Sequence, residues 1–425
     1  MKKALIITYY WPPAGGSGVQ RWLKFVKYFR EFGIEPIVYT VENPNYPILD
    51  NSLINDIPEN IEVLKYPIWE PNNFLAFFGK KKTESAGFLD PNPSFFGKTM
   101  QYIRANYFIP DARKFWVKPS VKYLKKYLSE NEIDVVITTG PPHSLHLIGL
   151  KLKKETGVKW MADFRDPWTE IDYFHQLPLS NQAIKKHHYL EAEVLKNADA
   201  VLVVGNTMKS KYDKFNSNVL TITNGFDGEI VDSRIELDAK FTITHIGLMN
   251  ADRNSKMLWE VLTQICDENL AFKSDFQLKL IGKMDASVLK EIAKHELSEN
   301  VEIVNYIAHK EVVEFQKKSQ VLLLVVNNVP SAKGIVTGKI FEYLMAKRPI
   351  LAIAPADGDL AAIIKQTNSG YVVDFNDGVL LKKTILDLYL KFCNNNLVVA
   401  SENIEQFNRK QLTAKVAEII NKITR

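Results

Sequence analysis

Cysteine is scarce in this sequence: a chain of 425 residues contains two, Cys266 and Cys393. They lie far apart and match no metal-ligand spacing, which excludes a disulfide framework and a cysteine-based metal cage. This usage fits a reducing compartment, so we predict a cytoplasmic protein.

Long apolar runs are missing too. The run at 4–8 has about five residues, fewer than a signal sequence needs and far fewer than the roughly 20 that span a bilayer, and we expect it to form the first strand.

Neither sign of charge dominates the composition. The formal net charge of +5 is too small to indicate a nucleic-acid partner by itself, and we predict none. Apolar residues make up 46% of the chain and charged residues 24%, without low-complexity tracts or internal repeats, which is typical of a soluble globular protein. The chain is too long for one ordinary core, so the length predicts two domains of about 200 residues each.

Short β-branched runs alternate with amphipathic helical stretches along the whole chain. Continuous apolar strands separated by helices predict parallel sheets covered on both faces, and two series of strands predict two doubly wound α/β halves. The polar segment 227–240 divides the two series. We expect one domain at 1–235, a second at 236–400, and a C-terminal helix within 401–425 near their junction. The predicted strands are 4–8, 36–39, 61–64, 135–138, 159–162, 200–204 and 219–222, then 241–246, 277–281, 301–303, 321–326, 350–353 and 370–373.

A glycine-rich loop follows the first strand. Gly15 and Gly16 lie between this strand and a helix that Ser17 is predicted to cap and that Gly33 ends. This edge of an open parallel sheet binds ligands, the helix N-terminus attracts anions, and glycines let a ligand approach the backbone. The pattern is not a full dinucleotide fingerprint, because Arg21 occupies the last glycine position. A tight turn without a ligand is the alternative interpretation.

A second loop of this kind precedes a helix in the other half of the chain. Gly334, Thr337 and Gly338 come before Lys339 and Glu342, which are three residues apart and share one helix face. A glycine and threonine helix start suits a diphosphate, the lysine adds a positive charge, and a carboxylate one turn later suits both hydroxyls of a ribose. The pattern predicts that these five residues bind a nucleotide diphosphate. An amphipathic helix with a solvated lysine and glutamate is the alternative.

Five sequence motifs are spread over almost the entire chain. They are PPAGGSGVQR at 12–21, DFRDPW at 163–168, NADAVLVVG at 197–205, TNGFD at 223–227 and GKIFEYLMAKRPILA at 338–352. In order and spacing this set resembles the retaining glycosyltransferases of family 4, which have the GT-B fold. The resemblance implies two Rossmann-like domains that face each other across a cleft. The C-terminal half would hold a nucleotide-sugar and the N-terminal half an acceptor.

The resemblance also implies roles for single residues. Glu342 matches the family's second motif glutamate, expected on the ribose, and Gly16 matches the glycine of the first loop, near the donor's phosphates or sugar. Arg253 and Lys256 match the basic pair that neutralises the diphosphate leaving group, although R-x-x-K alone is more often a solvated helix start. The family has a first glutamate eight positions before the second, where this chain has Gly334, and this departure leaves the donor sugar open.

The leaving group determines the expected chemistry. Departure of a nucleoside diphosphate from the anomeric carbon places negative charge on the phosphate oxygens and positive charge on the sugar ring. Arg253, Lys256, Lys339 and two helix N-termini can stabilise the phosphate charge without a metal ion. We therefore assign Arg253 and Lys256 catalytic roles and predict neither a metal site nor a cofactor.

Polar side chains follow two strands of the N-terminal half. Asp163, Arg165 and Asp166 come at the end of the fifth predicted strand, and His143 follows the fourth. We expect the first three to contact the acceptor or the sugar, and a self-paired network that shapes the loop is an equal alternative. His143 lies where the family's acceptor-side loop enters the cleft. This position suits a catalytic contact with a sugar hydroxyl or the leaving phosphate, against the commoner structural use of histidine.

An insert at about 71–119 alternates aromatic residues with basic clusters. It contains FLAFFGKKK at 74–82, SFFGK at 94–98 and YFIPDARKFW at 107–116. Such segments bind at a membrane interface or hold a lipid-linked acceptor. They serve equally well as helices that pack phenylalanines into the core. Peripheral contact with an anionic membrane, at its inner face, is thus one of two predicted uses.

These patterns together predict a retaining glycosyltransferase of the hexosyltransferase type. It would move a sugar from a nucleotide diphosphate donor to a glycan or lipid-linked acceptor, in the synthesis of a cell-surface polysaccharide or glycolipid. The alternatives are a nucleotide-sugar epimerase of the same two-domain fold and a non-catalytic nucleotide-sugar binding protein. The residues identify neither the sugar, the base and the acceptor nor the oligomeric state.

Overall fold

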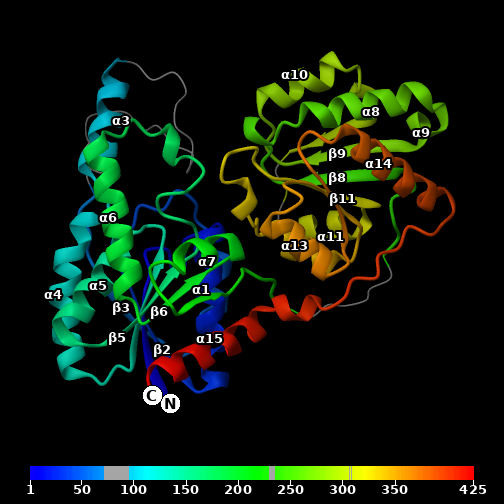
Figure 1. The fold of residues 1–425 in the computed structure, drawn as a ribbon. Helices are drawn as coiled ribbons and strands as arrows, with labels where there is room; N and C mark the ends of the chain where they lie inside the picture. Colours follow the sequence, from blue (N-terminus) through cyan, green and yellow to red (C-terminus); the bar gives the residue numbers. More distant parts are fainter. Residues whose placement is uncertain (71–94, 229–234, 306, 308) are drawn as a thin grey trace. The chain divides into compact units, whose positions relative to one another are not determined.

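The computed structural model describes residues 1–70, 95–228, 235–305, 307 and 309–425. The chain forms two compact units, residues 1–227 with 409–425 (the first unit) and residues 228–408 (the second unit). Each unit has one parallel β-sheet with helices on both faces, as the alternation of strands and helices predicts (Figure 1). The last helix of the chain belongs to the first unit.

The first unit contains a seven-stranded sheet in the order β3-β2-β1-β4-β5-β6-β7, and every pairing in it is parallel. Successive residues of a strand face opposite sides, and both sides are buried: Ala4 and Ile6 pack with one helical layer, Leu5 and Ile7 with the other. This double burial explains why the strand is continuously apolar. The strands are β1 (Lys2–Ile7), β2 (Ile34–Val41), β3 (Glu62–Tyr66), β4 (Val135–Gly140), β5 (Lys159–Phe164), β6 (Ala200–Val203) and β7 (Val219–Thr221).

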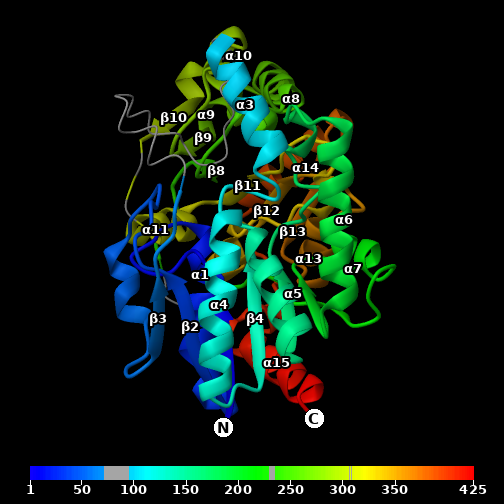
Figure 2. The same cartoon turned by 90° about the vertical axis from the view of Figure 1, so that its left-hand side faces the viewer.

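Helices cover both faces of this sheet. The helices α1 and α15 pack against each other on one face, and α4, α5 and α6 lie over the other (Figures 1 and 2). Gly16, with a φ of 84°, is the N-cap of α1, so the prediction that Ser17 caps this helix is wrong by one position. The helices are α1 (Ser17–Phe29), α3 (Phe95–Tyr107), α4 (Lys114–Glu130), α5 (Ser144–Thr156), α6 (Asn181–Asn197), α7 (Asn206–Tyr212) and α15 (Arg409–Ile423).

The second unit contains a six-stranded parallel sheet in the order β10-β9-β8-β11-β12-β13. Its strands are β8 (Phe241–Ile246), β9 (Phe276–Ile281), β10 (Val301–Val304), β11 (Val321–Val325), β12 (Ile350–Ile353) and β13 (Gly370–Val373). In this unit α8 packs against α14, and α11 packs against α12. The helices are α8 (Lys256–Glu268), α9 (Leu270–Asp275), α10 (Ala286–Lys294), α11 (His309–Lys318), α12 (Lys339–Ala346), α13 (Asp359–Gln366) and α14 (Gly378–Cys393).

The observed strands confirm all the predicted ones, with ends that differ by a few residues at most. The predicted insert has a mixed outcome. Its first part, with the aromatic and lysine cluster at 74–82, lies outside the described residues, whereas its later part forms α3 and the start of α4. Trp116 and Val117 of α4 are buried in the core of the first unit, which confirms core packing for these two residues. None of the helices in the described ranges is long and apolar enough to cross a membrane.

Candidate functional site

The glycine-rich loop after β1 packs against the segment that follows β2. Ala14 forms an isolated bridge with Leu49, and the backbone N–H of Gly15 donates to the carbonyl of Ile48 at 2.9 Å. A Cβ on Gly15 would lie 2.9 Å from the Ile48 side chain. Gly16 has a left-handed backbone conformation that favours glycine. Packing against Ile48 thus explains Gly15, and the backbone conformation explains Gly16. The N-terminus of α1, which follows these glycines in the chain, has no side-chain cap.

Asp163, at the end of β5, is fully buried in the first unit. Its carboxylate forms an ion pair with Arg21, with 2.8 Å between Oδ1 and Nη2. It also accepts hydrogen bonds from the indole N–H of Trp22 at 2.7 Å and the hydroxyl of Thr139 at 2.9 Å. This enclosure favours the alternative of a paired network, and the predicted contact of Asp163 with an acceptor or a sugar stays a prediction. In the observed pairing Asp163 has Arg21 as its partner, whereas Arg165 pairs with Asp166.

Arg165 follows Asp163 by two residues and joins the first turn of α1 to the loops after β4 and β5. Its guanidinium donates to the carbonyl of Gly18 at 2.7 Å and to that of Pro141 at 3.3 Å. Its Nε lies 3.5 Å from a carboxylate oxygen of Asp166. The Asp166 side chain is 47% exposed, so within the DFRDPW motif it is the carboxylate that a ligand can reach. Arg165 itself positions the glycine-rich loop.

His143 lies beneath aromatic rings in the loop after β4. Its ring stacks on Trp168, with centroids 5.0 Å apart and planes 5° apart, and lies 5.7 Å from the ring of His146. Burial, reinforced by the nearby His146 and Arg165, holds the pKa of His143 well below its ordinary value. The imidazole is therefore neutral and 8% exposed, which favours the structural interpretation. The predicted catalytic contact stays a prediction.

Lys339 begins α12 in the second unit and lies against the loop after β8. Its Nζ is 3.5 Å from Nε2 of His245 in β8, and a Cβ on Gly247 would lie 2.7 Å from the same Nζ. Gly247 has a φ of 107°. Both this left-handed conformation and the close approach of the Lys339 side chain therefore require glycine at this position. Burial, together with the positive charge of Arg253, lowers the pKa of Lys339 to about 7, and the negative charge of Glu342 opposes this shift.

Arg253 is held between the loops that follow β8 and β11. Its Nε donates to the side-chain oxygen of Asn327 at 2.7 Å, and Nη1 donates to the carbonyl of Leu248 at 2.9 Å. Its charge acts on Lys339, so the structure brings these two predicted cations together. Lys256 is the exposed first residue of α8, and it is not among the described groups that shift the pKa of Lys339.

The remaining predicted residues surround the N-terminus of α12. Glu342, one turn into the helix, accepts a hydrogen bond from the side-chain amide of Gln316 at 3.1 Å. Gly338 is the N-cap, and a Cβ there would meet no atom within 4 Å, so packing does not explain this glycine. The hydroxyl oxygen of Thr337 is buried without a hydrogen-bond partner among the described residues. Gly334 ends a short 3₁₀ turn, Ala332–Gly334.

Three residues of these sites are not predicted from the sequence. Arg21 interrupts a glycine pattern, and its charge within an apolar helix indicates a buried partner. His245, a titratable residue in a strand otherwise made of apolar residues and threonines, gave a similar signal shortly before Gly247. Asn327 had none, because its contact with Arg253 joins positions 74 residues apart in the chain.

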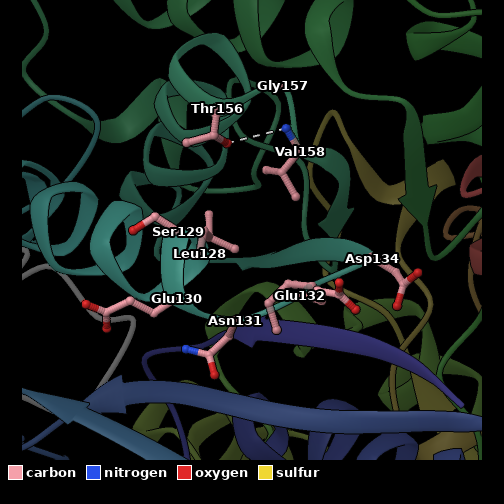
Figure 3. A pocket seen from close by; sticks show the side chains of 10 residues that line it. Leu128, Ser129, Glu130, Asn131, Glu132, Asp134, Thr156, Gly157 and Val158 are labelled. Atoms are coloured by element: carbon pink, nitrogen blue, oxygen red, sulfur yellow. Dashed lines mark hydrogen bonds between the residues drawn. The ribbon is translucent and has the colours of Figure 1, made fainter.

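A pocket of about 570 Å³ lies at the opposite, amino edge of the first sheet (Figure 3). It is lined by the ends of α4 and α5 and the residues before β4 and β5, with the carboxylates of Glu130, Glu132 and Asp134 and neither lysine nor arginine. An acidic lining repels a diphosphate, so this pocket does not suit the predicted donor. Among the described residues, no group of three or more His, Cys, Asp or Glu side chains is placed to hold a metal ion.

Comparison with known proteins places these observations in a family context. Residues 240–391, most of the second unit, match the family described as glycosyl transferases group 1. A search of curated proteins finds no match. Solved structures align over nearly the whole chain, at identities that show the fold alone.

Three of these structures illustrate the likeness. The sucrose-phosphate synthase of Thermosynechococcus elongatus is 15% identical with a TM-score of 0.57, over 100% of this chain and 96% of that one. The lipopolysaccharide outer core galactosyltransferase WaaB is 13% identical with a TM-score of 0.59, over 99% and 100%. A Listeria monocytogenes protein assigned as a UDP-N-acetylglucosamine 2-epimerase is 11% identical with a TM-score of 0.55, over 99% and 96%.

The chain therefore has the GT-B fold, with two parallel-sheet α/β units. The match of the second unit to the glycosyl transferases group 1 family supports a glycosyltransferase.

Proposed function

We propose that this protein is a retaining glycosyltransferase that moves a hexose-type sugar from a nucleotide diphosphate sugar to a glycan or lipid-linked acceptor. The observation that carries the proposal is the meeting of Lys339, Arg253 and the N-terminus of α12 at the carboxyl ends of β8 and β11. The similarity to a lipopolysaccharide galactosyltransferase favours an acceptor on the route to a cell-surface polysaccharide or glycolipid.

The positive groups of the second unit suit the leaving diphosphate. Negative charge grows on the phosphate oxygens as the glycosidic bond breaks, and fixed donors that already point at those oxygens stabilise the transition state. Arg253 is fixed by Asn327 and Leu248, while Lys339 stands beside a helix N-terminus that favours anions. A diphosphate beside Lys339 favours the protonated amine, so this group gains charge as the donor binds. Glu342, one turn later, is placed to accept the ribose hydroxyls.

In the first unit, the exposed Asp166 and the N-terminus of α1 are the proposed contacts for the acceptor and for the donor's phosphates or sugar. Both lie in loops at the carboxyl ends of strands, β5 and β1, where open parallel sheets bind ligands. Arg165 ties the two loops together through Gly18. Its proposed role is to position the glycine-rich loop rather than to touch the sugar.

A panel of nucleotide-sugars tests the proposal. Transfer, or slow hydrolysis with release of the nucleoside diphosphate, supports a transferase. NMR of the product then gives the anomeric configuration, and inversion would contradict the retaining mechanism. A changed sugar on an intact diphosphate supports the epimerase alternative, which the likeness to the Listeria protein keeps open. Binding without any product supports a non-catalytic binding protein.

We also propose that transfer needs no metal ion, because Arg253 and Lys339 neutralise the diphosphate. Turnover should then survive excess EDTA. Two carboxylates, Asp357 and Asp359, are two residues apart after β12, and Asp357 forms an exposed ion pair with Lys333. If chelation stops the reaction and magnesium or manganese restores it, Asp357→Asn and Asp359→Asn would show whether this pair holds the ion.

A further inference from the structure

Exposed aromatic side chains gather where α3 ends and α4 begins. The rings of Trp69 and Phe115 meet edge to face, 4.9 Å apart, and those of Phe108 and Phe115 do so at 5.8 Å. Trp69 is 60% exposed, Tyr107 66% and Phe115 39%. We call Trp69, Tyr107, Phe108 and Phe115 the aromatic patch. Ile103, one turn before Tyr107 on α3, is also exposed, so apolar surface continues along the helix.

Lysines surround the aromatic patch. The Nζ of Lys114 lies over the rings of Phe108 and Phe115, 5.5 Å and 5.1 Å from their centroids. Lys118 is exposed one turn further along α4, and Lys186 is exposed on α6. Burial and the charge of Lys186 lower the pKa of Lys114, which places these two ammonium groups near each other. Among the described residues, none of the three lysines forms an ion pair with a carboxylate.

The segment that contains α3 and α4 also carries mainly positive charge. Residues 95–129 contain eight lysines and arginines and a single acidic residue, Asp111. At the far end of α4 the lysines are compensated: Lys125 pairs with Glu155 at 2.7 Å, and Lys126 lies 3.8 Å from Glu130. At the end that carries the aromatic patch, Arg113 pairs with Glu70 at 3.0 Å, while Lys114 and Lys118 form no ion pair with a described carboxylate.

The patch lies at the carboxyl edge of the first sheet. Asp111, between α3 and α4, accepts hydrogen bonds from the backbone N–H of Ser144 at 2.9 Å and from its hydroxyl at 2.6 Å. Ser144 is the first residue of α5, directly after the loop that follows β4. The loops with His143 and Arg165 share this edge, and Figure 2 shows α3 above the first turn of α4.

We infer that the aromatic patch and its lysines dock the first unit onto an anionic lipid surface, with the carboxyl edge of the sheet toward the bilayer. Tryptophan and tyrosine favour the interface because each has an apolar body and a polar tip. Lysines beside them attract acidic headgroups. A soluble polyanion such as a nucleic acid fits less well, because base stacking uses aromatic rings and gives no role to the apolar surface that continues to the exposed Ile103. The inference does not depend on sugar transfer.

Sedimentation of the full chain with vesicles tests the inference. Vesicles of phosphatidylcholine alone are compared with vesicles that also contain phosphatidylglycerol, at low and high salt. We expect binding to the anionic vesicles only, weaker at high salt because the Debye length shortens. The variant K114S/K118S/K186S should lose about fivefold in affinity for each lysine removed. K125S/K126S, which removes two compensated lysines of the same helix, is the matched control and should bind like the parent protein.

Quenching by brominated lipids shows whether the aromatic patch enters the interface. Bromine quenches indoles only at short range, so binding should reduce the fluorescence of the parent protein, and W69F should lose that quenching without losing its fold by circular dichroism. Equal binding to both vesicle types, no binding, or an equal loss in the control variant would overturn the inference. Binding to soluble heparin that the triple lysine variant loses, with no quenching by lipid, would assign the surface to a polyanion instead.

Discussion

The guanidinium Nη2 of Arg21 lies 2.8 Å from a carboxylate oxygen of Asp163, and both side chains are buried in the first unit. Arg21 belongs to α1 and also donates to the carbonyl of Thr223 at 2.9 Å. Three of the five sequence motifs, those that contain Arg21, Asp163 and Thr223, thus meet at one buried ion pair. This contact gives a structural reason for residues that the motif pattern alone associates with substrate.

Removal of Arg21 should destabilise the first unit strongly. The variant R21L leaves the Asp163 carboxylate buried without its charged partner, a change that typically costs about 3–5 kcal/mol in free energy of unfolding. Urea denaturation followed by circular dichroism measures the loss. The double variant R21L/D163L removes both charges and should be more stable than R21L. Equal stability of the two variants would show that the Asp163 carboxylate left without Arg21 carries no such cost.

Donor affinity should fall as the pH rises above about 7. Below the Lys339 pKa of about 7 the amine is protonated in the free and bound protein, so affinity changes little. Above it, binding must take up a proton, because the diphosphate raises the pKa in the complex. The dissociation constant should then rise by up to about tenfold per pH unit. Calorimetry with a nucleotide-sugar from pH 6 to 9 measures this slope. K339R, whose charge does not titrate in this range, should flatten it, and a slope that persists in K339R would contradict the assignment.

Loss of the Glu342 carboxylate should weaken nucleotide binding. E342A removes charge-assisted hydrogen bonds to the ribose, and we expect a loss of about 1–3 kcal/mol in binding free energy. Calorimetry with the nucleoside diphosphate is the measurement. E314A is the control, because Glu314 lies on the neighbouring α11, is exposed and pairs with Lys318. An unchanged dissociation constant in E342A would remove Glu342 from the nucleotide site.

The first unit should lose stability in mild acid through its buried histidines. Burial lowers the pKa of His146 to about 3, although the charge of Asp163 opposes the shift. In the unfolded chain a histidine binds its proton near pH 6.5. The unfolded state therefore binds more protons below that pH. As the pH is lowered, the free energy of unfolding decreases by up to about 1.4 kcal/mol per pH unit because of this residue.

Urea denaturation at pH 7 and pH 5 checks this prediction. H146L should lose some stability at both values but show a smaller difference between them. His188, exposed on α6, provides the control H188Q, whose pH dependence should match that of the parent protein. An unchanged difference in H146L would mean that other groups cause the acid sensitivity.

Sequence by itself determined the fold class, because the information for a doubly buried parallel strand is local. A strand such as β11, with the sequence VLLLV, is apolar on both faces, so it appears as a continuous run between amphipathic helices. Glycine loops at strand ends were also visible, since a left-handed φ, as at Gly16, restricts the residue type locally. The same local information places Glu342 one turn after Lys339.

Tertiary structure alone decided which polar residues are enclosed and which stay exposed. Asp163 and Asp166 are equivalent in the sequence pattern, yet one is enclosed by Arg21, Trp22 and Thr139 while the other is half exposed. The pKa of Lys339 likewise depends on burial and on Arg253, 86 positions earlier in the chain. The burial of a side chain and the charges around it depend on residues that are close in space. Those residues can be far apart in the sequence, so the local pattern of residues does not predict them.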